Sequence, residues 1–465
     1  MNSSKLKRFG QQVKRFAAQF VQSGQTLLGQ IIPLAELEQW VRDEAGNHRE
    51  RKYGPLRTMM LFIEQVMGAD HSCQDAVARG ASQEVGRKPA ACSLNTGPYC
   101  KARQRLPLGL VQRLSQAVAE RLSARQAEHW KWRGREIKLV DGTTVSMPDT
   151  ADNRKDFPRS KGQKRGSASR WHVWWESCRC RAPPWSIGLW ARMRANKRVR
   201  LRCCGHCWST SSPATWGLAD RLYTSYFMIA RLMQFGVDVV MRQHQTRHTD
   251  FRRGKRLGAR DHVVQWERPA RPTWMDHATF AAMPATLTMR EVRAGGWTLV
   301  SSLTDANAVS KQELLDLYRS RWQVELDFRS IKDAMQMDVL RCKTAQMVRK
   351  EVAVHLLAYN LIRTVTAQAA HLARVLPRRV SFKAALQTLN AFLHNLRHCP
   401  QHSLPQRHAT LLAAIARLLL PVRPNRVEPR AVKRRPKPHR LLTQPRNILR
   451  ARLEKRQRRI LAAFA

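Results

Sequence analysis

Acidic residues are scarce in this chain of 465 residues, where 34 Asp and Glu stand against 83 Lys and Arg and the formal net charge is +49. A field of this size exceeds what solubility requires, and the partner that matches it best is a polyanion. The composition therefore predicts nucleic acid as the first partner. Charge alone leaves open a membrane-surface or ribosome-associated protein as the alternative.

Long apolar runs are also missing. No stretch reaches the roughly 18 apolar residues of a membrane-spanning helix. The nearest candidate, LLAAIARLLLPV from Leu411, is broken by Arg417. The first residues, MNSSKLKRFGQQVKRF, lack the apolar segment and the small-residue cleavage site of a secretory signal. We therefore expect a cytoplasmic protein, in which the ten cysteines stay reduced.

The length predicts two to four domains. Apolar residues recur at spacings of three and four before Arg135, whereas β-branched residues and Asp-Gly or Gly-Gly turns follow it. The tail mixes proline with positive charge, which is typical of a disordered polyanion-binding segment. The expected division is a helical DNA-binding region at 1–134, the first part of an α/β core at 135–236, a β-rich insertion at 237–305, a helical second part of the core at 306–420, and a basic proline-containing tail at 421–465.

The segment YRSRWQVELDFRSIK, from Tyr318 to Lys332, carries a polar column. At about 100° per residue, Tyr318, Arg321, Glu325 and Lys332 share an arc of about 60° on a helix. The apolar positions beside this arc are Leu317, Val324, Phe328, Ile331 and Met335. The pattern predicts a helix that buries its apolar stripe and presents the polar column at the edge of a cleft. For the Arg321 and Glu325 pair alone, a solvated surface ion pair worth a few tenths of a kcal/mol is the alternative.

Two further carboxylates stand where they could join Glu325. Asp141 follows the predicted strand EIKLV, and Asp220 precedes a predicted helix in GLADRLYTSYF. Metal-dependent phosphoryl transfer needs carboxylates from separate elements, because Mg²⁺ prefers hard oxygen ligands and two ions contact the attacking and leaving oxygens. Asp141, Asp220 and Glu325 are therefore candidate metal ligands.

With these residues the sequence resembles the bacterial DDE transposases of insertion-sequence family four, which share an acidic triad and a Tyr-Arg-Glu-Lys motif. The intervals of two, three and six residues between Tyr318, Arg321, Glu325 and Lys332 match that motif without a gap. The segments DGTTVSMPDT, ADRLYTSYF, DFRRGKRLG and YCKARQRLP are also similar to family segments. The resemblance runs from about residue 51 to 370, with an interruption between about 169 and 218.

The resemblance implies an α/β fold with an RNase H-like catalytic core, interrupted by a β-rich insertion and preceded by a helical N-terminal domain. Asp141, Asp220 and Glu325 would be the catalytic ligands of Mg²⁺ or Mn²⁺. Tyr318, Arg321 and Lys332 would contact DNA. By the same resemblance Trp297 would stack on a flipped base; a core tryptophan on a strand is the alternative.

The implied function is cut-and-paste transposition, that is, metal-dependent cleavage and strand transfer of insertion-sequence ends. Its partners would be double-stranded DNA with terminal inverted repeats and a second copy of the chain in a synaptic complex, in the bacterial nucleoid. Because phosphate contacts carry no sequence information, the helical N-terminal region would recognise the ends. A non-catalytic DNA-binding remnant and an RNase H-like nuclease without strand transfer remain the alternatives.

The stretch from Trp171 to Trp216 does not fit this pattern. It holds seven of the 14 tryptophans, five of the ten cysteines and a single carboxylate, and it sustains neither a strand period nor a helix period. We hypothesise a translated frameshift across residues 170–217, which would remove two core strands, shorten the strand before Asp220 and inactivate the chain. The alternative is a metal site, although adjacent cysteines at short spacings are atypical of structural zinc. Its ligands would be Cys203, Cys204, His206 and Cys207, with Cys178 or Cys180.

Overall fold

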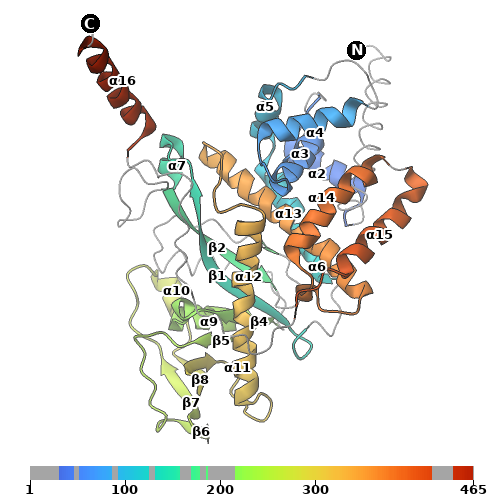
Figure 1. The fold of residues 1–465 in the computed structure, drawn as a ribbon. Helices are drawn as coiled ribbons and strands as arrows, with labels where there is room; N and C mark the ends of the chain where they lie inside the picture. The colour runs from blue at the N-terminus through green and yellow to red at the C-terminus, as the bar shows by residue number, and fades with distance from the viewer. Residues whose placement is uncertain are drawn as a thin grey trace.

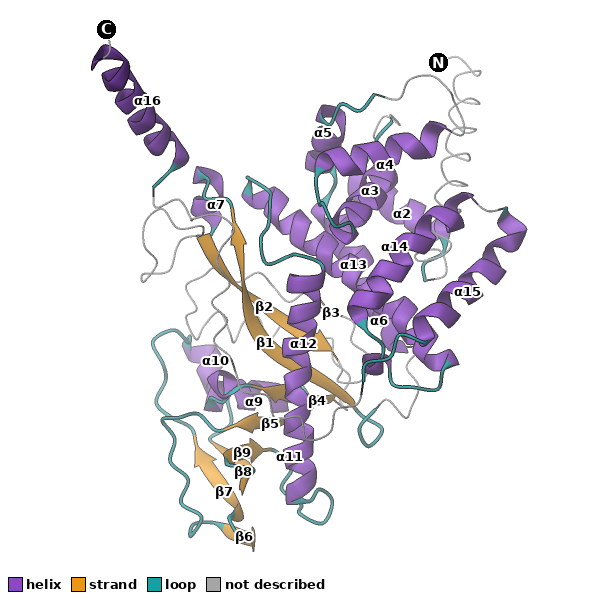
Figure 2. Cartoon of the chain, viewed as in Figure 1, coloured by secondary structure: helices purple, strands orange, loops and turns teal. Residues whose placement is uncertain are grey.

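The computed structural model describes residues 31–46, 52–85, 93–124, 131–157, 169–178, 185–186, 215–398, 400–421 and 444–463. Within them the chain forms a helical part and a mixed β-sheet, and Figure 1 places the two side by side. Figure 2 shows the helices α11 and α12 running across the sheet. The prediction of an α/β chain that begins with helices is confirmed at this level.

The helical part contains helices from before and after the sheet in the sequence, and they pack around one long helix. Helix α13 (Ala345–Leu372) is buried along nearly its whole length, including charged residues such as Lys350, Glu351 and Arg363. It packs against α3 and α6 from the N-terminal side and against α14 and α15 from the C-terminal side. The other helices of this part are α2 (Leu34–Ala45), α3 (Pro55–Met67), α4 (Cys73–Val85), α5 (Gly97–Arg105), α6 (Leu108–Ala124), α14 (Phe382–His398) and α15 (Leu404–Ala416).

Within the described ranges the sheet has nine strands in the order β3-β2-β1-β4-β5-β9-β8-β7-β6. Strands β1, β4 and β5 are parallel to one another, and all other neighbours are antiparallel. The strand bounds are β1 (Glu136–Met147), β2 (Ser169–Cys178), β3 (Trp185–Ser186), β4 (Thr215–Ala219), β5 (Val237–Arg242), β6 (Lys255–Gly258), β7 (Asp261–Glu267), β8 (Thr286–Ala294) and β9 (Trp297–Ser301). All five residues of β4 are buried, as expected for a central parallel strand.

The register of the parallel strands brings two acidic residues to one region. Val140 of β1 pairs with Ala219 of β4, and the next residue of each strand is an aspartate, Asp141 and Asp220. Strand β1 continues past Asp141 as the partner of β2, whereas the chain leaves the sheet at Asp220. The two carboxylates therefore start from adjacent backbone positions, although 78 residues of sequence lie between them.

The stretch from Trp171 to Trp216 contains more regular structure than the sequence predicted. Strand β2 pairs with β1 over ten residues, so the expectation of two missing core strands is wrong for β2. Strand β3 has only two residues. Strand β4 begins at Thr215 and is complete enough to pair on both sides. The cysteine and histidine residues of the alternative metal site from Cys180 onward lie outside the described residues.

The polar column does not lie on one uniform α-helix. The segment begins as α11 (Lys311–Arg319), whose N-terminus has a capping box between Ser310 and Glu313. It passes through a 3₁₀ turn, η3 (Ser320–Trp322), continues as α12 (Gln323–Arg329), and ends in a π-helical turn, η4 (Ser330–Ala334). The predicted apolar stripe is nevertheless buried, as the exposures of Leu317, Val324, Phe328, Ile331 and Met335 show.

The remaining elements are short, with one exception. They are α7 (Ala151–Asp156), η2 (Arg221–Tyr223), α9 (Tyr226–Gln234), α10 (His277–Ala281), η5 (Pro377–Arg379), η6 (Gln401–Ser403) and α16 (Arg446–Ala463). Helix α16 has 18 residues, extends away from the body in Figure 1, and forms within the tail that we expected to be disordered. In the part of the chain described here, no helix is both long and apolar enough to cross a bilayer.

Candidate active site

The Asp141 side chain is more enclosed than that of Glu325. Its side chain is 20% exposed, and the backbone N–H of Gly142 donates a 2.8 Å hydrogen bond to its Oδ1. Burial raises the pKa of this carboxyl group, Gly142 and Arg321 act against the rise, and Asp220 and Glu325 add to it. Asp220 and Glu325 are therefore close enough to act on the Asp141 carboxyl group.

Asp220 caps the short helix that follows β4. Its Oδ1 accepts a hydrogen bond from the backbone N–H of Leu222 at 3.2 Å, which fixes the side chain at the start of η2. The next turn is tied to the neighbouring strand, because the hydroxyl of Thr224 donates to the carbonyl of Arg242 at the end of β5. Asp220 thus has a defined orientation that the structure of β4 and β5 supports.

Arg321 forms ion pairs with both Asp141 and Glu325. Its Nη1 donates to Oδ2 of Asp141 at 3.1 Å, and its Nη2 donates to Oε1 of Glu325 at 3.0 Å. The Arg321 side chain is 17% exposed. Burial alone would lower the pKa of Arg321, but Tyr318 and the two carboxylates outweigh it and the pKa is raised. The guanidinium group therefore stays charged between carboxylates from β1 and α12, so the pair is more than a local i,i+4 contact.

The donor set fits a hard divalent cation in its chemistry. Asp141, Asp220 and Glu325 offer only carboxylate oxygens, and Arg321 already provides a positive charge between two of them. As the side chains stand, however, no three Asp, Glu, His or Cys residues within the described ranges form a group that could hold a metal ion together. Metal binding at this site would therefore require side-chain movement.

The other residues of the motif surround this group. Lys332, in the π-helical turn, donates from Nζ to the hydroxyl of Thr143 on β1 at 3.3 Å. Tyr318 is only 5% exposed, and burial raises its pKa, while Arg321 and Asp220 act on it with opposite signs. The structure thus brings all four motif residues to the side of the sheet on which Asp141 lies.

Trp297 lies beside Tyr318. The turn between β8 and β9 consists of Gly295 and Gly296, both at positive φ, which suits a two-residue hairpin. Trp297 follows this turn at once, and its ring meets that of Tyr318 edge-on at a centroid distance of 5.5 Å. It is partly buried against the main core. The ring is therefore close to the motif, in a contact that a core tryptophan would also make.

The sequence analysis missed Asp327, which anchors α12 from behind. This fully buried carboxylate accepts hydrogen bonds from the hydroxyl of Tyr359 at 3.0 Å and from the guanidinium groups of Arg363 and Arg378 at 3.2 and 2.8 Å. A signal was present, because Asp327 lies beside the apolar stripe, about 40° beyond Ile331, where a charged residue needs a buried partner. The network ties the helix that carries Glu325 to α13 and η5.

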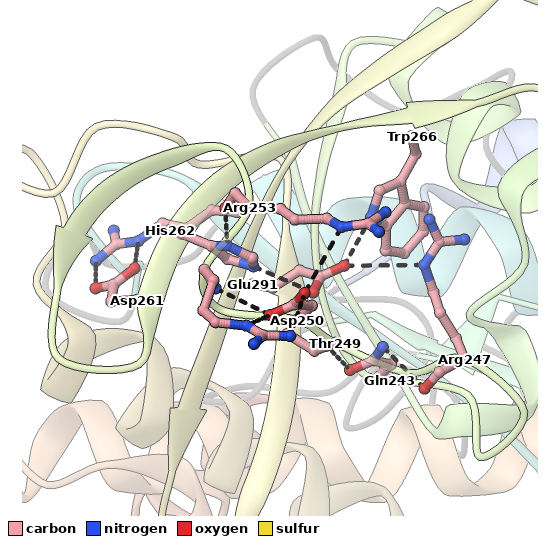
Figure 3. A network of polar contacts seen from close by, with 11 residues as sticks. Gln243, Arg247, Thr249, Asp250, Arg253, Asp261, His262, Trp266 and Glu291 are labelled. Atoms are coloured by element: carbon pink, nitrogen blue, oxygen red, sulfur yellow. Dashed lines mark hydrogen bonds and ion pairs between the residues drawn. The ribbon is translucent and has the colours of Figure 1, made fainter.

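A second unpredicted network stabilises the insertion (Figure 3). Glu291 accepts a 2.8 Å hydrogen bond from the indole N–H of Trp266 and contacts Nε2 of His262 at 3.3 Å. Arg247 covers the Trp266 ring at 3.6 Å and pairs with Glu291. These contacts fix the loop between β5 and β6 to the sheet.

The insertion is also joined to the helix that carries the motif. Arg290 is fully buried and pairs with Asp261 through two hydrogen bonds of 2.8 and 2.6 Å. Its remaining amino group donates to the carbonyl of Val309 at 2.6 Å, one residue before the cap of α11. A displacement of the insertion would therefore be transmitted to α11 and Tyr318.

Comparison with known proteins gives one family. A family model described as a transposase DDE domain matches residues 213–361, a range that begins just before β4 and ends within α13. The chain is 27% identical over 347 residues to the transposase InsG of insertion sequence element IS4 from Escherichia coli K12, which covers 72% of this chain and 76% of that protein.

Two further matches are more limited. The transposase of insertion sequence element IS421 from Escherichia coli is 32% identical over 71 residues, 15% of this chain and 19% of that protein. Among solved structures, the piggyBac transposase synaptic complex with hairpin DNA is similar, with a TM-score of 0.44 and 10% identity over 88% of this chain and 87% of that one.

Proposed function

We propose that the chain is a bacterial DDE transposase of insertion-sequence family four, which cleaves DNA at the ends of its insertion sequence and transfers the freed strand. The observation that carries the proposal is the meeting of Asp141 and Glu325 on the guanidinium of Arg321. Two carboxylates from distant elements, with Asp220 at the next strand end, form the kind of acidic group that phosphoryl transfer requires.

The proposed core is RNase H-like. Its support is the strand order β3-β2-β1-β4-β5, with β1, β4 and β5 parallel and β2 and β3 antiparallel, and with a helix, α12, against β1. Strand β5 falls within the range 237–305 that we predicted for the insertion, but it pairs with β4 as a core strand; strands β6 to β9 extend the same sheet as the rest of the proposed insertion. In this arrangement the catalytic residues would be Asp141 from the first strand, Asp220 from the fourth, and Glu325 from a helix that follows the insertion.

The proposed cofactor is Mg²⁺ or Mn²⁺, which when bound would neutralise charge on the scissile phosphate and activate the attacking oxygen. Asp141, Asp220 and Glu325 would hold it through their carboxylate oxygens. The chain itself orients these groups, through the Gly142 N–H on Asp141 and the η2 backbone on Asp220. Such positioning accounts for most of the catalysis in phosphoryl transfer.

Arg321 and Lys332 are the proposed phosphate-binding residues. Arg321 can bind a phosphate through two parallel hydrogen bonds, whereas Lys332 acts as a point charge. Tyr318 would contact the DNA end. Trp297 would stack on an extruded base, an interaction worth roughly 1 to 3 kcal/mol, and its edge contact with Tyr318 would hold the indole in place.

Recognition of the terminal inverted repeats is assigned to the helical N-terminal region, and joining of two ends to a homodimer. A nucleoid location follows if the chain acts on DNA. The second candidate function is that of a non-catalytic DNA-binding remnant, which is favoured by the unusual composition between Trp171 and Trp216 and by the two-residue strand β3.

The test is to incubate the purified protein with Mg²⁺ or Mn²⁺ and DNA that carries the flanking inverted repeats. Strand-transfer products support the proposal, cleavage alone indicates a nuclease, and binding without cleavage indicates the remnant. Glu325→Gln should abolish cleavage and leave DNA binding nearly unchanged. Asp316→Asn is the matched control, since Asp316 is exposed on the same helical segment and forms a local ion pair with Arg319.

A further inference from the structure

Arg321 holds an unusual position for a residue that binds DNA. Both of its terminal amino groups are used by carboxylates, one by Asp141 and one by Glu325. A surface i,i+4 pair would explain the Glu325 contact but not the contact with Asp141, which lies on a strand. The guanidinium therefore serves as the shared counter-cation of two acidic groups that are both proposed metal ligands.

Asp141 needs this cation most, because it is more enclosed than Glu325, whose side chain is 37% exposed. Asp141 is 20% exposed and its other oxygen, Oδ1, already accepts the Gly142 N–H. Enclosed carboxylates that lack a compensating charge are strongly disfavoured. A divalent cation would supply the same compensation at the same oxygens. Because like charges repel strongly in a partly desolvated site, Arg321 and a divalent cation compete for this place.

Arg321 has a second class of partner when DNA is present. Guanidinium groups form paired hydrogen bonds with phosphates as readily as with carboxylates. Lys332 cannot exchange a carboxylate for a phosphate in this way, because the hydrogen bond of its ammonium group goes to the neutral hydroxyl of Thr143 and not to Asp141 or Glu325. A DNA phosphate at the site would therefore draw Arg321 away from Asp141 and Glu325 and expose their oxygens.

We propose that Arg321 is the internal cation of the acidic site, and that its transfer from the carboxylates to a DNA phosphate makes divalent-metal binding and DNA binding reinforce each other. The inference rests on the proposed function, in which Asp141 and Glu325 are metal ligands. Since coupling between two ligands is reciprocal, DNA should raise metal affinity by the same factor by which metal raises DNA affinity.

The experiment measures Mn²⁺ binding to the full chain from the loss of the free-ion electron paramagnetic resonance signal, with and without duplex DNA that carries an insertion-sequence end. DNA alone provides the background. For the unmodified chain we expect DNA to strengthen Mn²⁺ binding about tenfold, within the usual range of coupling between sites. Arg321→Ala should bind Mn²⁺ about tenfold more tightly without DNA and gain little from DNA.

Two variants separate charge from structure. Arg321→Lys restores a cation and should return Mn²⁺ affinity toward that of the unmodified chain. Arg319→Ala is the matched control, since Arg319 pairs with Asp316 on the exposed side of the same segment and should have no effect. Thermal unfolding of each variant shows whether it is folded, and Arg321→Gln replaces Arg321→Ala if the latter is not.

The outcomes distinguish this inference from the proposed function. If Asp141→Asn and Glu325→Gln leave Mn²⁺ binding unchanged, the carboxylates are not metal ligands and both proposals fail. If those variants lose Mn²⁺ but Arg321→Ala binds it no more tightly than the unmodified chain, only the role of Arg321 is overturned. Persistent enhancement by DNA in Arg321→Ala would also overturn it.

Discussion

Asp327 illustrates how a single buried carboxylate can fix the position of the helix that carries Glu325. It accepts hydrogen bonds from two guanidinium groups and one hydroxyl, which belong to α13 and η5. Glu325 lies two residues away on the same helix. Because α12 has only seven residues and is flanked by 3₁₀ and π turns, its own hydrogen bonds give it little rigidity. The Asp327 network supplies the missing constraint.

Replacement of Asp327 by Ala should therefore be severely destabilising. It would leave Arg363 and Arg378 partly buried without their counter-ion, a type of change that costs about 3 to 5 kcal/mol. Urea unfolding monitored by circular dichroism measures the effect. Asp316→Ala, which removes an exposed pair, should cost less than about 1 kcal/mol. Equal effects of the two substitutions would contradict the role given to Asp327.

His71 predicts a pH dependence of stability. Burial lowers its pKa from 6.5 to about 4, and His355, whose ring lies 5.8 Å away, and Arg341 act in the same direction. A histidine with a lowered pKa in the folded state binds its proton more readily when the chain is unfolded. Its contribution is therefore complete above pH 6.5 and is lost as the pH falls toward 4.

The expected decrease in stability from His71 is roughly 3 kcal/mol over that interval. His71→Asn, which tolerates the positive φ of this position, should flatten the dependence of the urea midpoint between pH 6.5 and 4. The exposed His248 provides the control, since His248→Asn should leave the dependence unchanged. An unaltered slope in His71→Asn would show that other groups cause the acid sensitivity.

Residue-level prediction from sequence succeeded for the apolar stripe beside the motif, although the segment is not one uniform helix. The motif from Tyr318 to Lys332 was identified from its intervals alone, and the buried stripe beside it is present. Arg103 shows the limit. It lies in the basic segment YCKARQRLP, yet it is only 7% exposed and covers the Phe62 ring at 3.9 Å. That environment is formed by other helices, which the local pattern does not contain.

At the scale of elements, the turn chemistry and strand periods predicted β1, β5 and the insertion strands, but not how they join. The pairing of β5 with β9 makes one sheet of core and insertion, a result of long-range pairing that periodicity cannot supply. The 3₁₀ and π turns in the motif segment were also unpredictable, since the angular positions assumed a uniform α-helix. The prediction of the acidic group relied on Asp141 after a predicted strand, Asp220 before a predicted helix and Glu325 in the motif segment.

Helix α16 yields a prediction about DNA affinity. Its seven basic residues surround the axis, because Arg446, Arg458 and Arg452 lie about 120° apart, and all described side chains from Arg450 to Arg459 are exposed. A helix without an apolar face suits a partner that presents anions on two sides, such as the major groove of B-DNA, which admits an α-helix. The deep, narrow major groove of duplex RNA does not admit an α-helix.

Replacement of Arg450, Arg452, Arg456 and Arg459 by Gln should therefore weaken binding to duplex DNA of any sequence. The slope of log affinity against log salt concentration should fall by about 0.9 for each phosphate that the helix no longer neutralises. Fluorescence anisotropy at several NaCl concentrations measures both, with duplex RNA as the comparison. An equal decrease in affinity for RNA and DNA would indicate unspecific charge attraction rather than groove binding.

At the scale of the whole molecule, the frameshift hypothesis makes a prediction about the gene. The family match begins at residue 213, close to the point where the unusual composition ends. Reading codons 170–217 in the alternative frame should give segments of alternating apolar residues that extend β3. A chain with the restored frame should also unfold at a higher temperature. The absence of alternation in both other frames would exclude the hypothesis.

Helix α13 has a consequence for how the protein is made. The N-terminal helices α3 and α6 pack on a segment that lies more than 200 residues later in the chain. During synthesis their apolar faces stay uncovered until residue 372 has left the ribosome. A product that terminated early, within the unusual stretch for example, would lack this partner and would leave the apolar faces of α3 and α6 exposed to aggregation.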